Sequence, residues 1–208
     1  MEVHAPHSSV SSLKEALVHI LIVTIGILIA LGLDGLRETI HEHALVRDAR
    51  DNFRAELEEN RNNLLLEMKA VQVTHDEIGR IVKDFPTIDR DPGQMPARLK
   101  GINFPGYFFF NNAWDAAIST GALAHMDTRD VLILGGASKM ATTYFQIENT
   151  VGPANLAIQV YRDSATMDAT QLRDCEQRLR ELGFQSRVML GVEKEYLNVI
   201  DKALEIVK

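Results

Sequence analysis

The chain has 208 residues, a formal net charge of −7, and 46% hydrophobic and 25% charged residues. This length allows one or two domains, and the composition is ordinary for a folded protein. The acidic balance, without a concentrated tract of Lys and Arg, argues against nucleic acid as a partner. The single cysteine, Cys175, excludes an intramolecular disulfide.

The first element is an apolar run at residues 17–33 that contains no charged side chain. As an α-helix this run would span about 26 Å, which approaches the thickness of a hydrocarbon core. We therefore predict a short tail at 1–12 and a transmembrane helix at 13–35. The tripeptide Ala30-Leu31-Gly32 also resembles a signal-peptidase site, so cleavage after Gly32 is the alternative. The apolar run continues through this site without a polar region, which favours an uncleaved anchor in contact with membrane lipid.

The charges that flank this helix give little orientational bias. Lys14 lies before it and Arg37 after it, and acidic residues count little in the positive-inside rule. A tail of about a dozen residues is easily left in the cytoplasm while the following chain is exported. We therefore expect a bacterial inner-membrane protein whose C-terminal domain is periplasmic.

One face of the predicted membrane helix carries small residues. Gly26 and Ala30 are four residues apart, a spacing that lets two helices approach closely. His19 lies seven residues before Gly26, on roughly the same face. This face is either a contact surface for a partner or a second copy, or it places His19 at the membrane edge, where its ring reaches interfacial water. The second interpretation is favoured.

An apolar stripe with mixed charges opposite it continues after the membrane helix and predicts an amphipathic helix at 36–83. Residues on this stripe recur every seven positions: Leu57, Leu64 and Val71. They are candidate contacts with a protein partner or a homo-oligomer, in a pattern of coiled-coil type. Asn60 and Asn63 weaken the stripe and favour packing in a bundle over a free two-stranded coil.

Residues 84–111 are rich in Pro and Gly, so we predict a loop without a helix of normal length. Four of the eight Phe residues lie at 104–110. These rings either cover the ends of the helices, which is favoured, or are presented to a partner, with Phe108 as the candidate contact.

Residues 112–208 are predicted as further helices that complete the bundle, so the fold class is all-α. Four boundaries are expected: an N-cap at Asn112 with a C-cap at Gly121, an N-cap at Asp127 or Thr128, a break at Gly152-Pro153, and a last helix from Asp168.

Two short motifs resemble a family of uncharacterised bacterial single-pass membrane proteins. GILIALGLDGLRE at 26–38 is similar to that family's GILIAL-type membrane helix, although Leu36 stands where the family often has Trp. AWDAAISTGAL at 113–123 is similar to its TWxxLxxSGxL element. The resemblance implies location and architecture, and it brings no activity with it.

Motifs for catalysis or metal binding are weak. Glu38 and His41 have the spacing of a di-iron motif, but such a site needs a second copy, which the sequence lacks. Cys175 falls on an apolar helical face, as a small core residue would. There is no Gly-x-Ser-x-Gly and no phosphate-binding loop. We therefore expect no enzyme, cofactor or metal.

The leading hypothesis is a single-pass inner-membrane protein whose helical domain binds a protein partner or itself. The alternative is a membrane-anchored ligand sensor with a pocket near the aromatic segment at 104–114. Trp114 is a ligand contact in that alternative; otherwise it anchors the short helix into the bundle, which is favoured.

Overall fold

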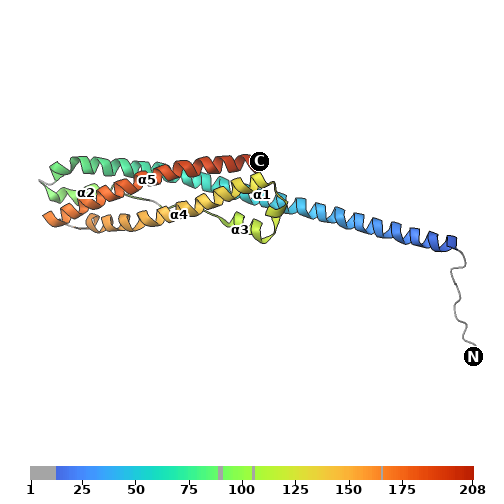
Figure 1. Ribbon diagram of the computed structural model, residues 1–208. Coiled ribbons are helices and arrows are strands. Elements are labelled where there is room, and N and C mark those ends of the chain that lie inside the picture. The colour runs from blue at the N-terminus through green and yellow to red at the C-terminus, as the bar shows by residue number, and fades with distance from the viewer. Residues whose placement is uncertain (1–12, 89–90, 105, 165) are drawn as a thin grey trace, which may run out of the picture. The chain divides into compact units, whose positions relative to one another are not determined.

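The computed structural model describes residues 13–88, 91–104, 106–164 and 166–208. Helices dominate this part of the chain and no strand occurs in it, which confirms the all-α class (Figure 1). The predicted tail at 1–12 lies outside the described residues. The elements in order are α1 (Leu13–Ile88), η1 (Pro92–Gln94), α2 (Met95–Leu99), α3 (Asn112–Ser119), η2 (Ala122–His125), α4 (Thr128–Arg162) and α5 (Ala169–Ile206).

The chain divides into two compact units, residues 1–45 and residues 46–208, and α1 runs through both. The first unit, as far as it is described, is helical from Leu13. Its apolar window is long enough to cross a membrane, and none of that window is buried in the protein. The hydroxyl of Thr24 donates to the carbonyl of Ile20 at 2.8 Å, so its polar group is satisfied within the helix.

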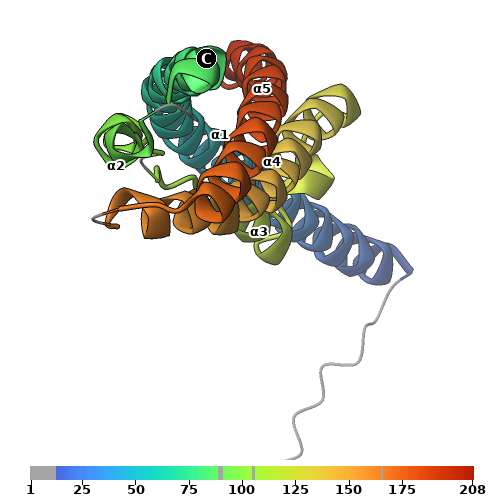
Figure 2. The ribbon, with the colours of Figure 1, turned by 90° about the vertical axis from the view of Figure 1, so that its left-hand side faces the viewer.

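The second unit is a bundle of three long helices, namely the later part of α1 together with α4 and α5. Seen along its length, these helices surround a common core, and α2 lies beside them (Figure 2). The residues predicted to repeat along α1, Leu57, Leu64 and Val71, are all buried in this core. Facing positions on α5, such as Leu179 and Leu182, are buried as well. The heptad spacing therefore serves packing within the chain.

Several predicted boundaries agree with the structure. Asp127 accepts a hydrogen bond from the N–H of Arg129 at 2.8 Å and caps α4. Asp168 accepts from the N–H groups of Thr170 and Gln171 and forms a capping box that starts α5. Gly121 has φ of +76° and is the turn that follows α3.

Other boundaries differ because tertiary packing outweighs local signals. α1 continues to Ile88, through Pro86 and into the predicted loop at 84–111, because the apolar side chains around Pro86 are buried. The expected break at Gly152-Pro153 is wrong, since α4 runs through both residues to Arg162. Proline removes one helical hydrogen bond, but buried side chains on either side of it keep the helix packed.

Candidate functional site

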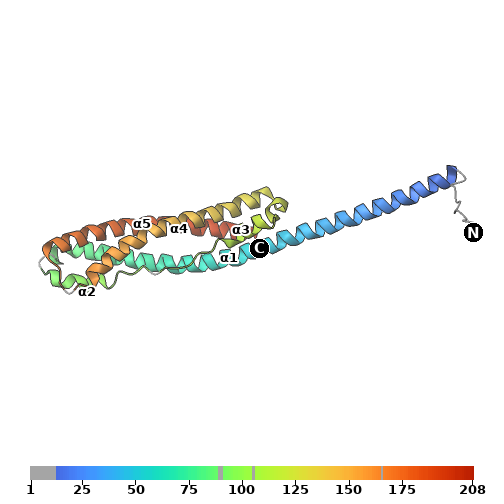
Figure 3. The same ribbon diagram turned by 90° about the horizontal axis from the view of Figure 1, so that it is seen from below.

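The segment at 103–111, which we call the strap, runs along α1 from α2 to α3 (Figure 3). Pro105 within it lies outside the described residues. Polar side chains of α1 bind its backbone at successive points. Thr74 donates to the carbonyl of Asn103 at 2.6 Å and Asn63 to that of Phe108 at 2.8 Å.

Asn60 holds the end of the strap with two hydrogen bonds. Its amide donates to the carbonyl of Phe110 at 2.7 Å, and its oxygen accepts from the N–H of Phe110 at 2.8 Å. An extended chain has no internal backbone partners, so these side chains replace the ladder that a neighbouring strand would supply. Asn60, which the sequence indicates as a weak point of an apolar stripe, therefore has a specific partner in the strap.

The strap presents its aromatic rings to opposite sides, as an extended chain does. Phe109 points inward, with its ring centroid 5.0 Å from that of Tyr144 and 6.0 Å from that of Tyr196. Phe108 points outward and is 82% exposed. The segment thus covers the core with one ring and leaves its neighbour available at the surface.

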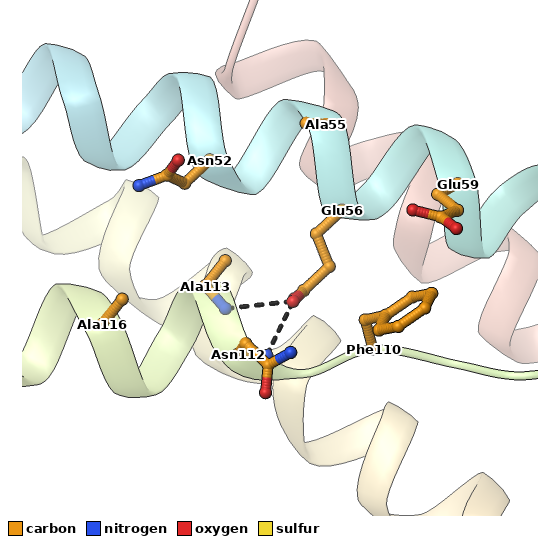
Figure 4. A pocket seen from close by; sticks show the side chains of 8 residues that line it. All are labelled: Asn52, Ala55, Glu56, Glu59, Phe110, Asn112, Ala113 and Ala116. Carbon is orange, nitrogen blue, oxygen red and sulfur yellow. Dashed lines mark hydrogen bonds between the residues drawn. The ribbon is translucent and has the colours of Figure 1, made fainter.

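Glu56 of α1 binds the start of α3 (Figure 4). Its carboxylate accepts from the N–H groups of Asn112 at 2.6 Å and Ala113 at 3.0 Å. Burial raises the pKa of Glu56, and these two hydrogen bonds oppose the rise. Asn112 is the first residue of α3, so the prediction that it is the N-cap is wrong. The group that accepts from the first N–H groups of α3 is the carboxylate of Glu56, which comes from α1. The hollow beside Glu56 holds about 290 Å³ and is also lined by Glu59. The carboxylate of Glu56 is already bound by the two backbone N–H groups of α3.

A pair of carboxyl groups lies in the centre of the bundle. Glu67 of α1 is 1% exposed and Glu193 of α5 is fully buried. The hydroxyl of Tyr144, from α4, donates to Glu193 at 3.4 Å. All three long helices therefore contribute a polar group to one buried cluster.

Burial raises the pKa of both carboxyl groups, so each stays protonated to a higher pH than an exposed Glu does. It raises the pKa of Glu67 from 4.5 to about 8, and the charges of Glu148 and Glu193 add to the rise while Tyr144 opposes it. Burial also raises the pKa of Glu193 to about 7. At neutral pH Glu67 is accordingly mostly neutral.

A groove of about 610 Å³ opens over Glu67, between the strap and α4. Phe108, Phe145 and Leu156 form an exposed apolar rim. Its lining contains two carboxyl and two amide side chains and no Lys, Arg or His among the described residues. The lining residues are Glu67, Phe104, Gly106, Tyr107, Phe108, Phe145, Glu148, Asn149, Val151, Gly152, Pro153, Asn155, Leu156 and Met189.

Two polar atoms of this lining have no hydrogen-bond partner among the described residues. They are Oε2 of Glu67 and Oδ1 of Asn155, a residue that is 9% exposed. A buried acceptor without a donor costs about 1–3 kcal/mol, so proteins rarely keep one without a reason. Oε2 of Glu193 in the same cluster has no partner either, but Glu193 does not line the groove. Because Glu67 and Asn155 both line it, the groove is the strongest candidate site in the described part of the chain.

The residues predicted as contacts fall into different places. His19, Gly26 and Ala30 are exposed in the first unit. Leu57, Leu64 and Val71 are buried within the chain's own bundle, so they offer no surface to a partner. Phe108 lies on the groove.

Trp114 does not line the groove. The prediction that Trp114 contacts a ligand therefore does not apply to this groove. Its ring packs against Phe53, with centroids 6.3 Å apart, and closely over Gly135 of α4. These contacts agree with the interpretation of Trp114 as the anchor of the short helix.

Sequence reasoning missed Glu67, Glu193 and Asn155. A usable signal existed, because Asn60, Glu67 and Thr74 also recur every seven residues and are buried. A polar residue at such a core position indicates either a polar network or a site.

No protein-family model, curated protein or solved structure matches the chain. The resemblance to a family of single-pass membrane proteins therefore stays a prediction from two short motifs. Among the described residues no group of three or more His, Cys, Asp or Glu side chains is placed to hold a metal ion.

Proposed function

We propose that the chain is a single-pass bacterial inner-membrane protein whose helical domain is a non-catalytic ligand-binding module on the periplasmic side. The observation that carries the proposal is the groove over Glu67, whose lining includes two buried side chains that each have a polar atom without a hydrogen-bond partner among the described residues. A bound molecule that forms hydrogen bonds with these two atoms would satisfy both of them. The sequence offers this function as the alternative hypothesis, and the groove supports it.

The apolar helix supports the anchoring part of the proposal. The side chains of residues 17–33 are exposed throughout the first unit, and lipid is the environment that such a surface fits. Epitope tags after residue 40 and at the C-terminus, probed by protease in intact and permeabilised cells, test the orientation. Protection of both tags until the outer barrier is opened supports a periplasmic domain, and cleavage only after the inner membrane is lysed contradicts it.

A fluorophore at the rim of the groove tests the binding part. Asn149→Cys places a thiol at an exposed lining residue. The native Cys175 is fully buried and burial raises its pKa to about 12. The fluorophore should therefore react selectively with the new thiol at position 149. The full chain in phosphatidylcholine nanodiscs is then titrated with hexylammonium, hexanol, hexanoate and their phenyl analogues.

A saturable change in emission with at least one of these probes is expected. The control is Lys202→Cys, at an exposed position near the end of α5. Equal responses at both positions, or none at Asn149→Cys with any probe, contradict a binding groove.

Self-assembly through the membrane segment is a second candidate function. A side chain added at Gly26 meets no other atom within 4 Å, so the small-residue face with Ala30 is open. Gly26→Leu should abolish close helix association in a membrane two-hybrid assay, with Gly32→Leu as the control in the same helix. Unchanged association in Gly26→Leu contradicts this candidate.

A further inference from the structure

We propose that the groove over Glu67 binds an alkylammonium ion, that is, a soluble primary amine in its protonated form with an apolar chain. This inference rests on the proposed function and names the ligand class of that site.

The charge of the lining selects a cation. Glu67 and Glu148 both line the groove, Glu193 lies behind it, and no basic side chain is among the described lining residues. An anion would meet up to three carboxyl groups without compensation. A cation would offset the charge of Glu67 in a place where burial makes that charge costly.

The unpartnered atoms select a group with several donors. Oε2 of Glu67, when that carboxyl is ionised, and Oδ1 of Asn155 can each accept a hydrogen bond, and they come from different helices, α1 and α4. A primary ammonium has three N–H donors and can serve both acceptors. Once Glu67 is ionised, an alcohol with its single donor leaves one of the two oxygens unpaired, and a quaternary ammonium has no donor for either.

The rim selects an apolar chain. Phe104, Tyr107, Phe108 and Phe145 all line the groove, and the rings of Phe108 and Phe145 are largely exposed to solvent. Aromatic faces attract cations and cover hydrocarbon, so both parts of an alkylammonium ion are accommodated. The groove volume of about 610 Å³ falls within the usual range for small-molecule sites.

Binding should release a proton, because Glu67 is mostly neutral in the free protein at pH 7. The ammonium ion favours the carboxylate, and the proton passes to solvent. The titratable groups around Glu67 are Tyr144 and Glu148 of α4 and Glu193 of α5, with Tyr107 of the strap on the same groove. None of these carries a positive charge, so among the described groups around Glu67 no cation competes with the ligand.

The test uses hexylammonium as the probe and the full chain in phosphatidylcholine nanodiscs, with isothermal titration calorimetry between pH 6 and pH 8. We expect binding of hexylammonium at pH 8 at least about tenfold tighter than that of hexanol, and no binding of hexanoate. The affinity should fall by about tenfold per unit as the pH falls from 7 to 6, because Glu67 must lose its proton.

Two variants separate the parts of the argument. Glu67→Gln mimics the neutral side chain, so the fold is retained while the affinity falls at least about tenfold and loses its dependence on pH. Asn155→Leu should weaken binding and keep the pH dependence. The matched control is Glu58→Gln, an exposed carboxylate on the same helix that does not line the groove.

Hexanol binding as tightly as hexylammonium, or Glu67→Gln binding with unchanged affinity and pH dependence, overturns the assignment. If hexanol or hexanoate alone alters the label at Asn149→Cys, the groove is a binding site and only the ammonium assignment fails. Loss of hexylammonium binding in nanodiscs that contain phosphatidylethanolamine would replace the soluble amine by a lipid headgroup.

Discussion

Replacing Glu67 by Gln is expected to remove much of the pH dependence of the protein's stability. Burial raises the pKa of Glu67 to about 8 in the folded chain, whereas an unfolded chain exposes the carboxyl and returns its pKa to about 4.5. Between these values the folded state holds more protons than the unfolded state. The free energy of unfolding must therefore fall as the pH rises from about 5 to 8.

The size of the effect follows from the proton count. One extra proton in the folded state changes the free energy of unfolding by about 1.4 kcal/mol per pH unit. From pH 5 to pH 8 the contribution of Glu67 is at most roughly 4 kcal/mol, a large part of the stability of an ordinary domain. Glu193, with a pKa of about 7, adds a decline of the same sign in both the wild-type chain and the variant.

The assay is unfolding by urea in a mild non-ionic detergent at pH 5, 6, 7 and 8. Fluorescence of Trp114 follows the transition, because its ring is packed against Phe53 and Gly135 in the folded chain. The difference in unfolding free energy between wild type and Glu67→Gln should change by about 1.4 kcal/mol per unit. Parallel curves for the two proteins over this range would refute the view that Glu67 is neutral in the fold.

Three further predictions concern packing, capping and reactivity. Gly135→Ala should lower stability by about 1–3 kcal/mol in the same urea assay, because an added Cβ would lie 2.8 Å from the Trp114 ring, whereas Gly136→Ala, with open space around it, should not destabilise. Glu56→Ala should cost about 1–3 kcal/mol by leaving the N–H groups of Asn112 and Ala113 without their acceptor, with Glu58→Ala as the control; equal losses in the two would contradict this role. Cys175 should react with a maleimide only after unfolding, since it is buried and its pKa is about 12, and rapid labelling of the native chain would contradict the packing of α5.

The main helices could be predicted from the sequence because their signals are local. The apolar run before Asp34 and the caps at Asp127 and Asp168 each act within one or two helical turns. The seven-residue repeat of Leu57, Leu64 and Val71 likewise indicates a buried face. It does not say what covers that face. In the structure Leu57 lies around one small cavity with Leu134 of α4 and Tyr196 of α5, so helices of the same chain cover it.

The candidate site could not be predicted because its parts meet only through tertiary packing. The strap has no periodic signal, and its place is fixed by Asn60 and Asn63, which lie about 45–50 residues earlier in the chain. The continuation of α4 through Pro153 has the same origin. A helix break at Pro153 would place Asn155 differently relative to Glu67. The wrong prediction at this proline therefore also prevents the groove from being predicted.

The polar residues on the buried face of α1 divide into two kinds, and the division bears on function. Asn60 and Thr74 lower the apolar content of the core, but each forms hydrogen bonds with the strap, so its place has a structural cause. Glu67 occupies the position between them in the same seven-residue series, yet one of its oxygens has no partner among the described residues. A Leu or Met there would pack without the cost of burying a carboxyl group. Binding the strap accounts for Asn60 and Thr74, and a hydrogen bond with Tyr144 accounts for part of the polar character of Glu67. A donor bound in the groove would satisfy its remaining oxygen.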